Sequence, residues 1–282
     1  MPFTTILSVA ELVAHRTAQW VIVDCRFQLG DTEYGRKAHA EGHIEGAHYA
    51  HLDDELSGTI IPGVTGRHPA PDPKAFRTCL GNWGIGPDTQ VVAHDDGPGA
   101  MGARLWWLLR YSGHPNVAVL NGGWAAWTGA GKPVSTAAVG SKGGPSYPIR
   151  RPLVLTANAK ELATAIKESL PDPILVDARA AERFRGDTEP LDAVAGHIPG
   201  AACRPFLENI GPDGLFLSPS DLRKRFEPLG HPRDIVHYCG SGVTGAHNLL
   251  AMEVAGLPGA RLYPGSWSEW ITEPLHPVAL GD

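Results

Sequence analysis

Short apolar runs alternate with helical patterns along both halves of the chain. In the second half, strands are predicted over Ile174–Asp177, Ile235–Tyr238 and Ala260–Leu262. Helices are predicted over Asp221–Leu229 with Ser220 as its cap, over Val243–Ala255, and around Trp267 and Trp270. Strands that alternate with helices through short connections predict an α/β fold. We therefore expect mostly parallel sheets with helices on both faces.

Four sequence blocks of the first half return in the second half in the same order. The pairs are VIVDCR with LVDAR, GHIEGA with GHIPGA, AHDDGPGAMG with HYCGSGVTG, and GGWAAW with PGSWSEW. Chance similarity does not keep four blocks collinear, so the chain is interpreted as a duplicated domain. Residues 132–152, rich in Gly, Pro and Ser, predict a linker between a domain over 1–131 and a second over 153–282.

Composition excludes several classes of protein. The 282 residues are 43% apolar with a net charge of −6 and no Lys/Arg run longer than Arg223-Lys224-Arg225, which gives no basis for nucleic-acid binding. The N-terminal stretch lacks the pattern of a signal peptide, and no apolar run has the length of a membrane span. The four cysteines are scattered, which favours a reducing compartment, and we expect a cytoplasmic protein. No Cys/His cluster predicts a metal site.

The stretch HYCGSGVTG, residues 237–245, is the candidate functional loop of the second half. Its glycines spell G-x-G-x-x-G between a predicted strand and a predicted helix, as in a dinucleotide-binding turn. Against that function, the next strand ends in Tyr263-Pro264-Gly265 without the acidic residue that would bind a ribose. A cysteine phosphatase loop would need an arginine at position 245, where this chain has glycine.

A thiolate-binding loop explains more of these residues. Cys239 follows a strand and precedes a helix, so backbone amides and the helix N-terminus can stabilise its anion. Gly240 and Gly242 permit a left-handed backbone, and Thr244 is expected to cap the helix. Such surroundings lower a cysteine pKa from about 8.5 to roughly 3.5–7.5. The alternative is a cysteine that is merely buried at a strand end, which we assign to Cys25, Cys79 and Cys203.

The loop C-G-S-G-V-T, both Gly-His-Ile blocks and both Asp-x-Arg strand ends resemble the two-domain sulfurtransferases of the rhodanese superfamily. Within that superfamily the loop is most similar to that of the branch acting on 3-mercaptopyruvate. The thiosulfate-using branch typically has Arg and Lys where this chain has Gly240 and Ser241. The resemblance implies two tandem rhodanese-like domains. It also implies a non-catalytic first domain, in accord with Asp95 at the position matching Cys239.

The resemblance implies a reaction through a Cys239 persulfide, with no cofactor and no metal. The donor is mercaptopyruvate or thiosulfate, and the acceptor is a thiol, thioredoxin or cyanide. By motif match, Ser241, His43 and Asp31 are the expected catalytic partners of Cys239. His43 is equally explained as a packing residue, since His197 has the same place in the repeat.

Substrate binding is expected from the loop and from arginines of the second domain. The loop residues concerned are Gly240, Gly242, Val243 and Thr244. Arg183 falls on one arginine position of the family, whereas Leu191 falls on another, and Arg185 is a candidate replacement. Leu191 favours thiosulfate as the donor, and the missing loop lysine opposes it. A persulfide carrier with little turnover is a further alternative.

Overall fold

The computed structural model describes residues 2–171 and 173–282, which form two compact units. The first unit extends to Gly58 and includes Pro71–Leu153 and Pro212–Phe216. The second unit comprises Thr59–Ala70, Val154–Gly211 and Leu217–Asp282. A segment from the first half of the sequence, Thr59–Ala70, thus belongs to the second unit.

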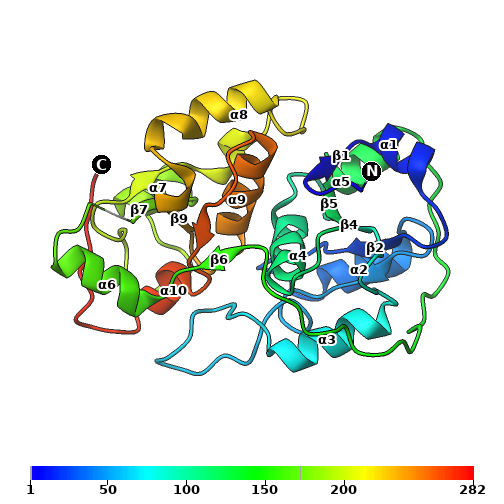
Figure 1. Cartoon of the computed structure of the whole chain (residues 1–282), viewed down its shortest axis with the longest axis horizontal. Helices are drawn as coiled ribbons and strands as arrows, with labels where there is room; N and C mark the ends of the chain where they lie inside the picture. Colours follow the sequence, from blue (N-terminus) through cyan, green and yellow to red (C-terminus); the bar gives the residue numbers. More distant parts are fainter. Residues whose placement is uncertain (1, 172) are drawn as a thin grey trace. The chain divides into compact units, whose positions relative to one another are not determined.

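The first unit is built on a parallel five-stranded sheet of order β1-β5-β4-β2-β3 (Figure 1). Its strands are β1 Ile6–Leu7, β2 Val21–Asp24, β3 His48–Tyr49, β4 Val91–His94 and β5 Val117–Leu120. Its helices are α1 Val9–His15, α2 Tyr34–Glu41, α3 Pro73–Asn82, α4 Ala100–Tyr111 and α5 Gly123–Gly129.

The second unit repeats this topology in a parallel sheet of order β6-β10-β9-β7-β8. Its strands are β6 Leu155–Thr156, β7 Ile174–Asp177, β8 Ala202–Cys203, β9 Ile235–Tyr238 and β10 Arg261–Leu262. Its α-helices are α6 Ala159–Lys167, α7 Ala181–Arg185, α8 Pro219–Phe226, α9 Thr244–Val254 and α10 Ser266–Trp270. Its 3₁₀ helices are η1 Phe206–Asn209, η2 Glu227–Leu229 and η3 Pro232–Asp234. The two identical strand orders confirm the duplicated α/β fold that the repeated blocks predict.

The predicted strands of the second half are confirmed as β7, β9 and β10, and the predicted helix over 243–255 as α9. The cap predicted at Ser220 is wrong. Ser218 caps α8, because its hydroxyl accepts a hydrogen bond from the Asp221 amide at 3.2 Å and proline follows at the first helical position. Among the residues that the structure describes, no helix is long and apolar enough to cross a membrane.

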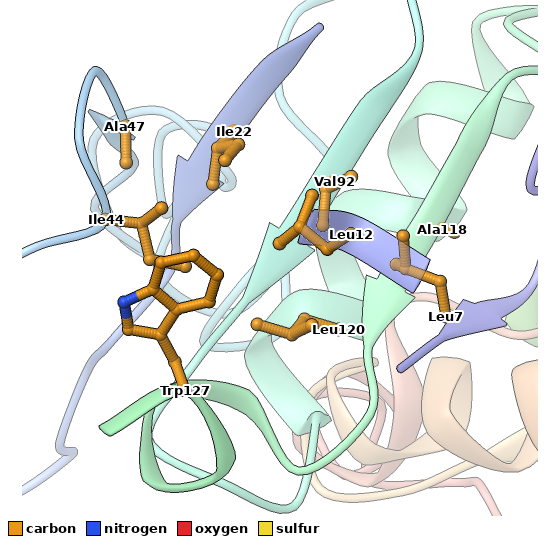
Figure 2. Close-up of a cluster of buried hydrophobic side chains, with 9 residues drawn as sticks. All are labelled: Leu7, Leu12, Ile22, Ile44, Ala47, Val92, Ala118, Leu120 and Trp127. Atoms are coloured by element: carbon orange, nitrogen blue, oxygen red, sulfur yellow. The ribbon is translucent and has the colours of Figure 1, made fainter. Parts of the chain in front are cut away.

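The core of the first unit lies between its sheet and its helices. Figure 2 shows Trp127 of α5 among aliphatic side chains from the strands, from α1 and from the Gly-His-Ile turn. The indole nitrogen of Trp127 donates to the Pro133 carbonyl at 2.9 Å. In the second unit, Trp270 of α10 is fully buried and donates to the Pro277 carbonyl at the same distance. The repeated tryptophan therefore has the same packing role twice.

The Asp-x-Arg motif joins a strand end to the Gly-His-Ile turn in both units. Arg26 forms a buried ion pair with Asp24 at 2.6 Å and donates to the Gly42 carbonyl. Arg179 pairs with Asp177 at 2.6 Å and donates to the Gly196 carbonyl. Both arginines thus have a structural role, in which a buried ion pair ties the strand end to the turn.

Residues 132–152, which the composition predicts to be a linker, lie in the first unit. Tyr147 is buried there, and its hydroxyl lies 3.0 Å from Nδ1 of His114. The Tyr147 amide also donates to the Arg77 carbonyl at 2.9 Å. This segment packs against the first unit along part of its length.

Candidate active site

Cys239 lies in a tight loop between β9 and α9 of the second unit (Figure 1). The apolar strand β9 ends at Tyr238, and α9 begins at Thr244. The residue Cys239 is 2% exposed, so water solvates its sulfur very little. An anion there depends on hydrogen bonds from the protein.

The loop supplies those hydrogen bonds to the sulfur. The Gly242 amide donates to Cys239 Sγ at 3.1 Å. Burial raises the pKa of Cys239. Hydrogen bonds from the Thr244 side chain and from the Gly245 and Ser241 amides outweigh burial, so the pKa of Cys239 lies below its ordinary value. Thr244 is not the predicted cap, because it is the first helical residue and its hydroxyl serves the sulfur instead.

The other three cysteines show the opposite behaviour. Burial raises the pKa of Cys79 to about 12 and that of Cys203 to about 11. Burial and the nearby Asp24 carboxylate raise the pKa of Cys25 well above its ordinary value. Cys239 is therefore the one cysteine of the four whose surroundings favour the thiolate, which is the nucleophilic form.

The start of α10 fixes the backbone of the cysteine. Ser266 Oγ accepts a hydrogen bond from the Cys239 amide at 3.1 Å and donates to the Tyr263 carbonyl at 2.9 Å. The amides of Trp267 and Ser268 donate to the carbonyls of Cys239 and Gly240, each at 2.9 Å. Ser266 has a φ of 56°, a left-handed conformation that is unusual for a residue with a side chain.

The two loop glycines have different purposes. Gly242 has a φ of 80°, and a Cβ there would lie 2.3 Å from the Pro264 carbonyl oxygen, so this position requires glycine. Gly240 lies outside the left-handed region, contrary to the expectation for it. A Cβ at Gly240 would instead lie 2.8 Å from an Nη atom of Arg67. Val243, which precedes α9, is buried.

Ser241 makes a side-chain contact that sequence reasoning missed. Its buried hydroxyl lies 2.7 Å from Nδ1 of His68, which belongs to the Thr59–Ala70 segment of the second unit. A sequence signal for this segment exists. His43 and Asp95 are 52 positions apart, whereas their repeat partners His197 and Cys239 are 42 apart. The first half therefore holds ten additional residues in the interval that contains His68.

His43 and Asp31 both lie in the first unit. The His43 ring stacks on His39 with centroids 4.0 Å apart, and its Nδ1 lies 2.7 Å from the His39 carbonyl oxygen. His197, its repeat partner, stacks on Phe184 in the same manner. Asp31 is exposed, with its carboxylate 3.9 Å from the Lys37 ammonium. The catalytic roles expected of His43 and Asp31 stay predictions.

The structure brings Arg183 but not Arg185 toward the loop. A Cβ at Gly240 would lie 3.5 Å from both Nη atoms of Arg183. Arg185 is paired with Asp187 at 2.8 Å, and about a third of its side chain is exposed (34%). The exposed Leu191 is 44% accessible and donates its amide to Glu189 at 3.1 Å.

The first unit contains the same loop with an aspartate in place of the cysteine. The Asp95 carboxylate accepts hydrogen bonds from the amides of Gly97, Gly99 and Met101 at 2.9–3.0 Å. The amide of Trp124 donates to the Asp95 carbonyl at 2.8 Å, as Trp267 does to Cys239. The duplicated loop is thus an anion-binding nest in both units, occupied by a carboxylate in one and a sulfur in the other.

A family model described as the rhodanese-like domain matches residues 8–130 and again residues 158–273. The chain belongs to the rhodanese-like family. Both predicted tandem rhodanese-like domains are confirmed by these two matches.

Curated relatives of this family member are sulfurtransferases. A Pseudomonas aeruginosa protein named "probable 3-mercaptopyruvate sulfurtransferase" is 49% identical over 266 residues, which is 93% of each chain. The thiosulfate sulfurtransferase of Rattus norvegicus is 35% identical, over 89% of this chain and 84% of its own. The solved 3-mercaptopyruvate sulfurtransferase from Leishmania major superposes with a TM-score of 0.82 at 31% identity, over 95% of this chain and 74% of its own.

Proposed function

We propose that this rhodanese-like chain is a sulfurtransferase that takes sulfur from 3-mercaptopyruvate onto Cys239. The observation that carries the proposal is the buried sulfur with a lowered pKa in its ring of hydrogen-bond donors. A thiolate attacks the donor sulfur without a separate base, and the lowered pKa increases the fraction of Cys239 in that form. The sulfurtransferase relatives support this reaction class.

Sulfur transfer proceeds in two steps through a persulfide of Cys239. The Cys239 thiolate forms an S–S bond to the donor sulfur while the donor C–S bond breaks and its electron pair leaves as the enolate of pyruvate. The proton of the donor thiol moves to that enolate, which gives pyruvate and a Cys239 persulfide. A thiol, reduced thioredoxin or cyanide then attacks the outer sulfur and restores the thiolate. No organic cofactor or metal is needed for either step.

Ser241 and His68 are proposed to carry the proton. Their side chains are in hydrogen-bond contact at 2.7 Å, and Ser241 lies within the loop that holds the sulfur. A hydroxyl joined to an imidazole can accept and return a proton beside the breaking bond. The geometry of this pair supports His68 in the role that the family resemblance assigns to His43.

Thiosulfate is the second candidate donor. Leu191 at an arginine position of the family favours it, and so does the thiosulfate sulfurtransferase relative.

The four cysteines are free thiols, which supports the proposed cytoplasmic, reducing compartment.

Rates with the two donors on one enzyme preparation test the proposal. We expect kcat/KM for mercaptopyruvate to exceed that for thiosulfate. A preference for thiosulfate by about tenfold or more would assign the chain to the other donor. Loading of one sulfur, a gain of about 32 Da on Cys239, without multiple turnover would instead make it a carrier.

A further inference from the structure

Arg67 is held beside the active loop by its own backbone. Its amide donates to Ser268 Oγ at 3.0 Å, and the Ser268 amide donates to the Gly240 carbonyl at 2.9 Å. A Cβ on the preceding residue, Gly66, would lie 2.6 Å from both Gly265 O and Ser268 Oγ. The chain therefore passes so close to α10 that only glycine fits at residue 66. This close packing fixes the backbone position of Arg67.

The Arg67 guanidinium lies against the position where a side chain at residue 240 would be. An Nη atom of Arg67 is 2.8 Å from the ideal Cβ of Gly240, and both Nη atoms of Arg183 are 3.5 Å from the same point. Since Gly240 is outside the left-handed region, its backbone conformation does not explain the glycine. A side chain at residue 240 would instead displace the Arg67 guanidinium from its place beside the loop.

Two buried carboxylates hold these guanidiniums in place. Asp192 pairs with Arg67 through one oxygen and with Arg183 through the other, the latter at 3.1 Å. Glu189 pairs with Arg183 at 2.7 Å and accepts the Asp192 amide at 3.1 Å. Both carboxylate side chains are 3% exposed, whereas those of Arg67 and Arg183 are 28% and 17% exposed. The buried acids thus orient two partly accessible cations.

We propose that Arg67, together with Arg183, binds the anionic group of the sulfur donor beside Cys239. This inference rests on the proposed function and extends it to a residue of the Thr59–Ala70 segment. Both candidate donors are anions, one with a carboxylate and one with the oxygens of thiosulfate, and both must approach a thiolate that repels them. A planar guanidinium offsets that repulsion and pairs with either oxygen group through two parallel hydrogen bonds. Burial and the nearby Arg183 charge lower the pKa of Arg67, and the Cys239 thiolate acts against them, which agrees with the proximity of Arg67 to the sulfur.

The competing explanation is that the Arg67–Asp192 pair merely tethers the Thr59–Ala70 segment. Charge separates the two explanations. Removal of Arg67 and removal of the Asp192 charge both break the tether, but only the first removes a cation from the loop. The variant Asp192→Asn keeps a polar side chain beside both arginines but removes one negative charge, so its electrostatic effect is opposite to that of Arg67→Gln.

Alkylation of Cys239 by an anionic and by a neutral reagent tests the proposal without sulfur transfer. Iodoacetate carries a carboxylate and iodoacetamide is neutral, while the attacking thiolate and the leaving group are the same. We expect Arg67→Gln to lower the ratio of the iodoacetate rate to the iodoacetamide rate by about tenfold, as for one lost charge-assisted hydrogen bond. The iodoacetamide rate, which reports the thiolate itself, stays within about twofold.

Two control variants test whether net charge alone, or the ion pair that holds the Thr59–Ala70 segment, explains a change in the ratio. Arg223→Gln removes an exposed guanidinium paired with Glu227 on α8 and leaves the ratio unchanged. Asp192→Asn leaves the ratio unchanged or raises it. An unchanged ratio in Arg67→Gln, or an equal fall in Arg67→Gln and Asp192→Asn, would overturn the proposal.

Steady-state kinetics then distinguish the two donors. Arg67→Gln raises KM by about tenfold for the donor whose anion Arg67 binds, with a smaller change in kcat. A rise for mercaptopyruvate alone identifies the carboxylate, and a rise for both identifies a general anion site. A fall in kcat with KM unchanged contradicts a binding role. The alkylation result stands even if neither donor is turned over, so the two proposals fail separately.

Discussion

Asp95 directly follows β4 of the first unit as Cys239 directly follows β9 of the second, and each side chain accepts hydrogen bonds from amides of the loop that comes after it. The parallel explains how one fold supports both a structural and a chemical residue. A carboxylate is a permanent anion at neutral pH and satisfies the nest without reacting. A thiolate satisfies the same donors and remains a nucleophile. The nest is therefore present in both units, and only the second one holds a sulfur.

Asp95→Ala is expected to destabilise the first unit. The substitution leaves the buried Gly99 amide without its acceptor, together with those of Gly97 and Met101. The free energy of unfolding should fall on the order of 3 kcal/mol. Urea unfolding, with hydrogen exchange of the 97–102 peptide, measures this. The exposed Asp88→Ala serves as control, and an equally stable Asp95→Ala would mean that the nest needs no anion.

Ser266 offers a test of strain beside the nucleophile. Its φ of 56° resembles the 54° of Gly123, its repeat partner. Ser266→Ala and Ser266→Gly both lose the hydrogen bond to the Cys239 amide, but only glycine relieves the left-handed backbone. We expect Ser266→Gly to be more stable than Ser266→Ala by about 1 kcal/mol in urea unfolding. The reverse order would show that the backbone at this position is not strained.

The contact between Ser241 and His68 predicts coupled effects on catalysis. Ser241→Ala and His68→Gln should each lower kcat with mercaptopyruvate by about 100-fold. The double variant should be little worse than either single variant, because both remove the same proton path. Fully additive losses would separate the two residues.

His43→Gln is the informative companion to those variants. Its ring packs on His39, so we expect a loss of stability rather than a specific loss of kcat. If His43→Gln lowers kcat and His68→Gln does not, the proton partner is the residue that the family resemblance selects.

The fold could be predicted from the sequence because its evidence is local and repeated. The apolar runs predict β7 and β9, and the four collinear blocks predict the duplicated domain. Cys239 could also be selected from the sequence as the candidate nucleophile, since a cysteine directly before a glycine-rich helix start is placed to form a thiolate. The start of α8 and its cap at Ser218 were missed, because Ser218 and Ser220 lie within three residues. Only Ser218 is placed to accept a hydrogen bond from a helix amide.

The side chains that pack against the Cys239 loop could not be predicted in the same way. His68 and Arg67 reach the loop through tertiary packing of Thr59–Ala70, a segment with no periodic pattern and no repeat partner. The sequence predicts a left-handed backbone at Gly240, whereas the structure places the Arg67 guanidinium, distant in sequence, against this position. Contacts of this kind depend on where long loops pack, which local propensity does not encode.

The lowered pKa of Cys239 also sets a pH dependence. The folded pKa lies below the ordinary value, so the hydrogen bonds to the thiolate stabilise the fold above the ordinary pKa. That stabilisation is lost as the pH falls through the lowered, folded pKa. Sulfur uptake should decline over the same interval, because the thiol form does not attack. Initial rates with a donor whose own ionisation is constant there would measure the decline.

Alkylation by iodoacetamide against pH, resolved by peptide mass spectrometry, tests the central claim most directly. All four cysteines can be followed in one molecule, so Cys25, Cys79 and Cys203 serve as internal controls. The account predicts a Cys239 midpoint below about 8.5, with the other three at or above it. A Cys239 midpoint at or above 8.5 would contradict the thiolate and the chemistry derived from it.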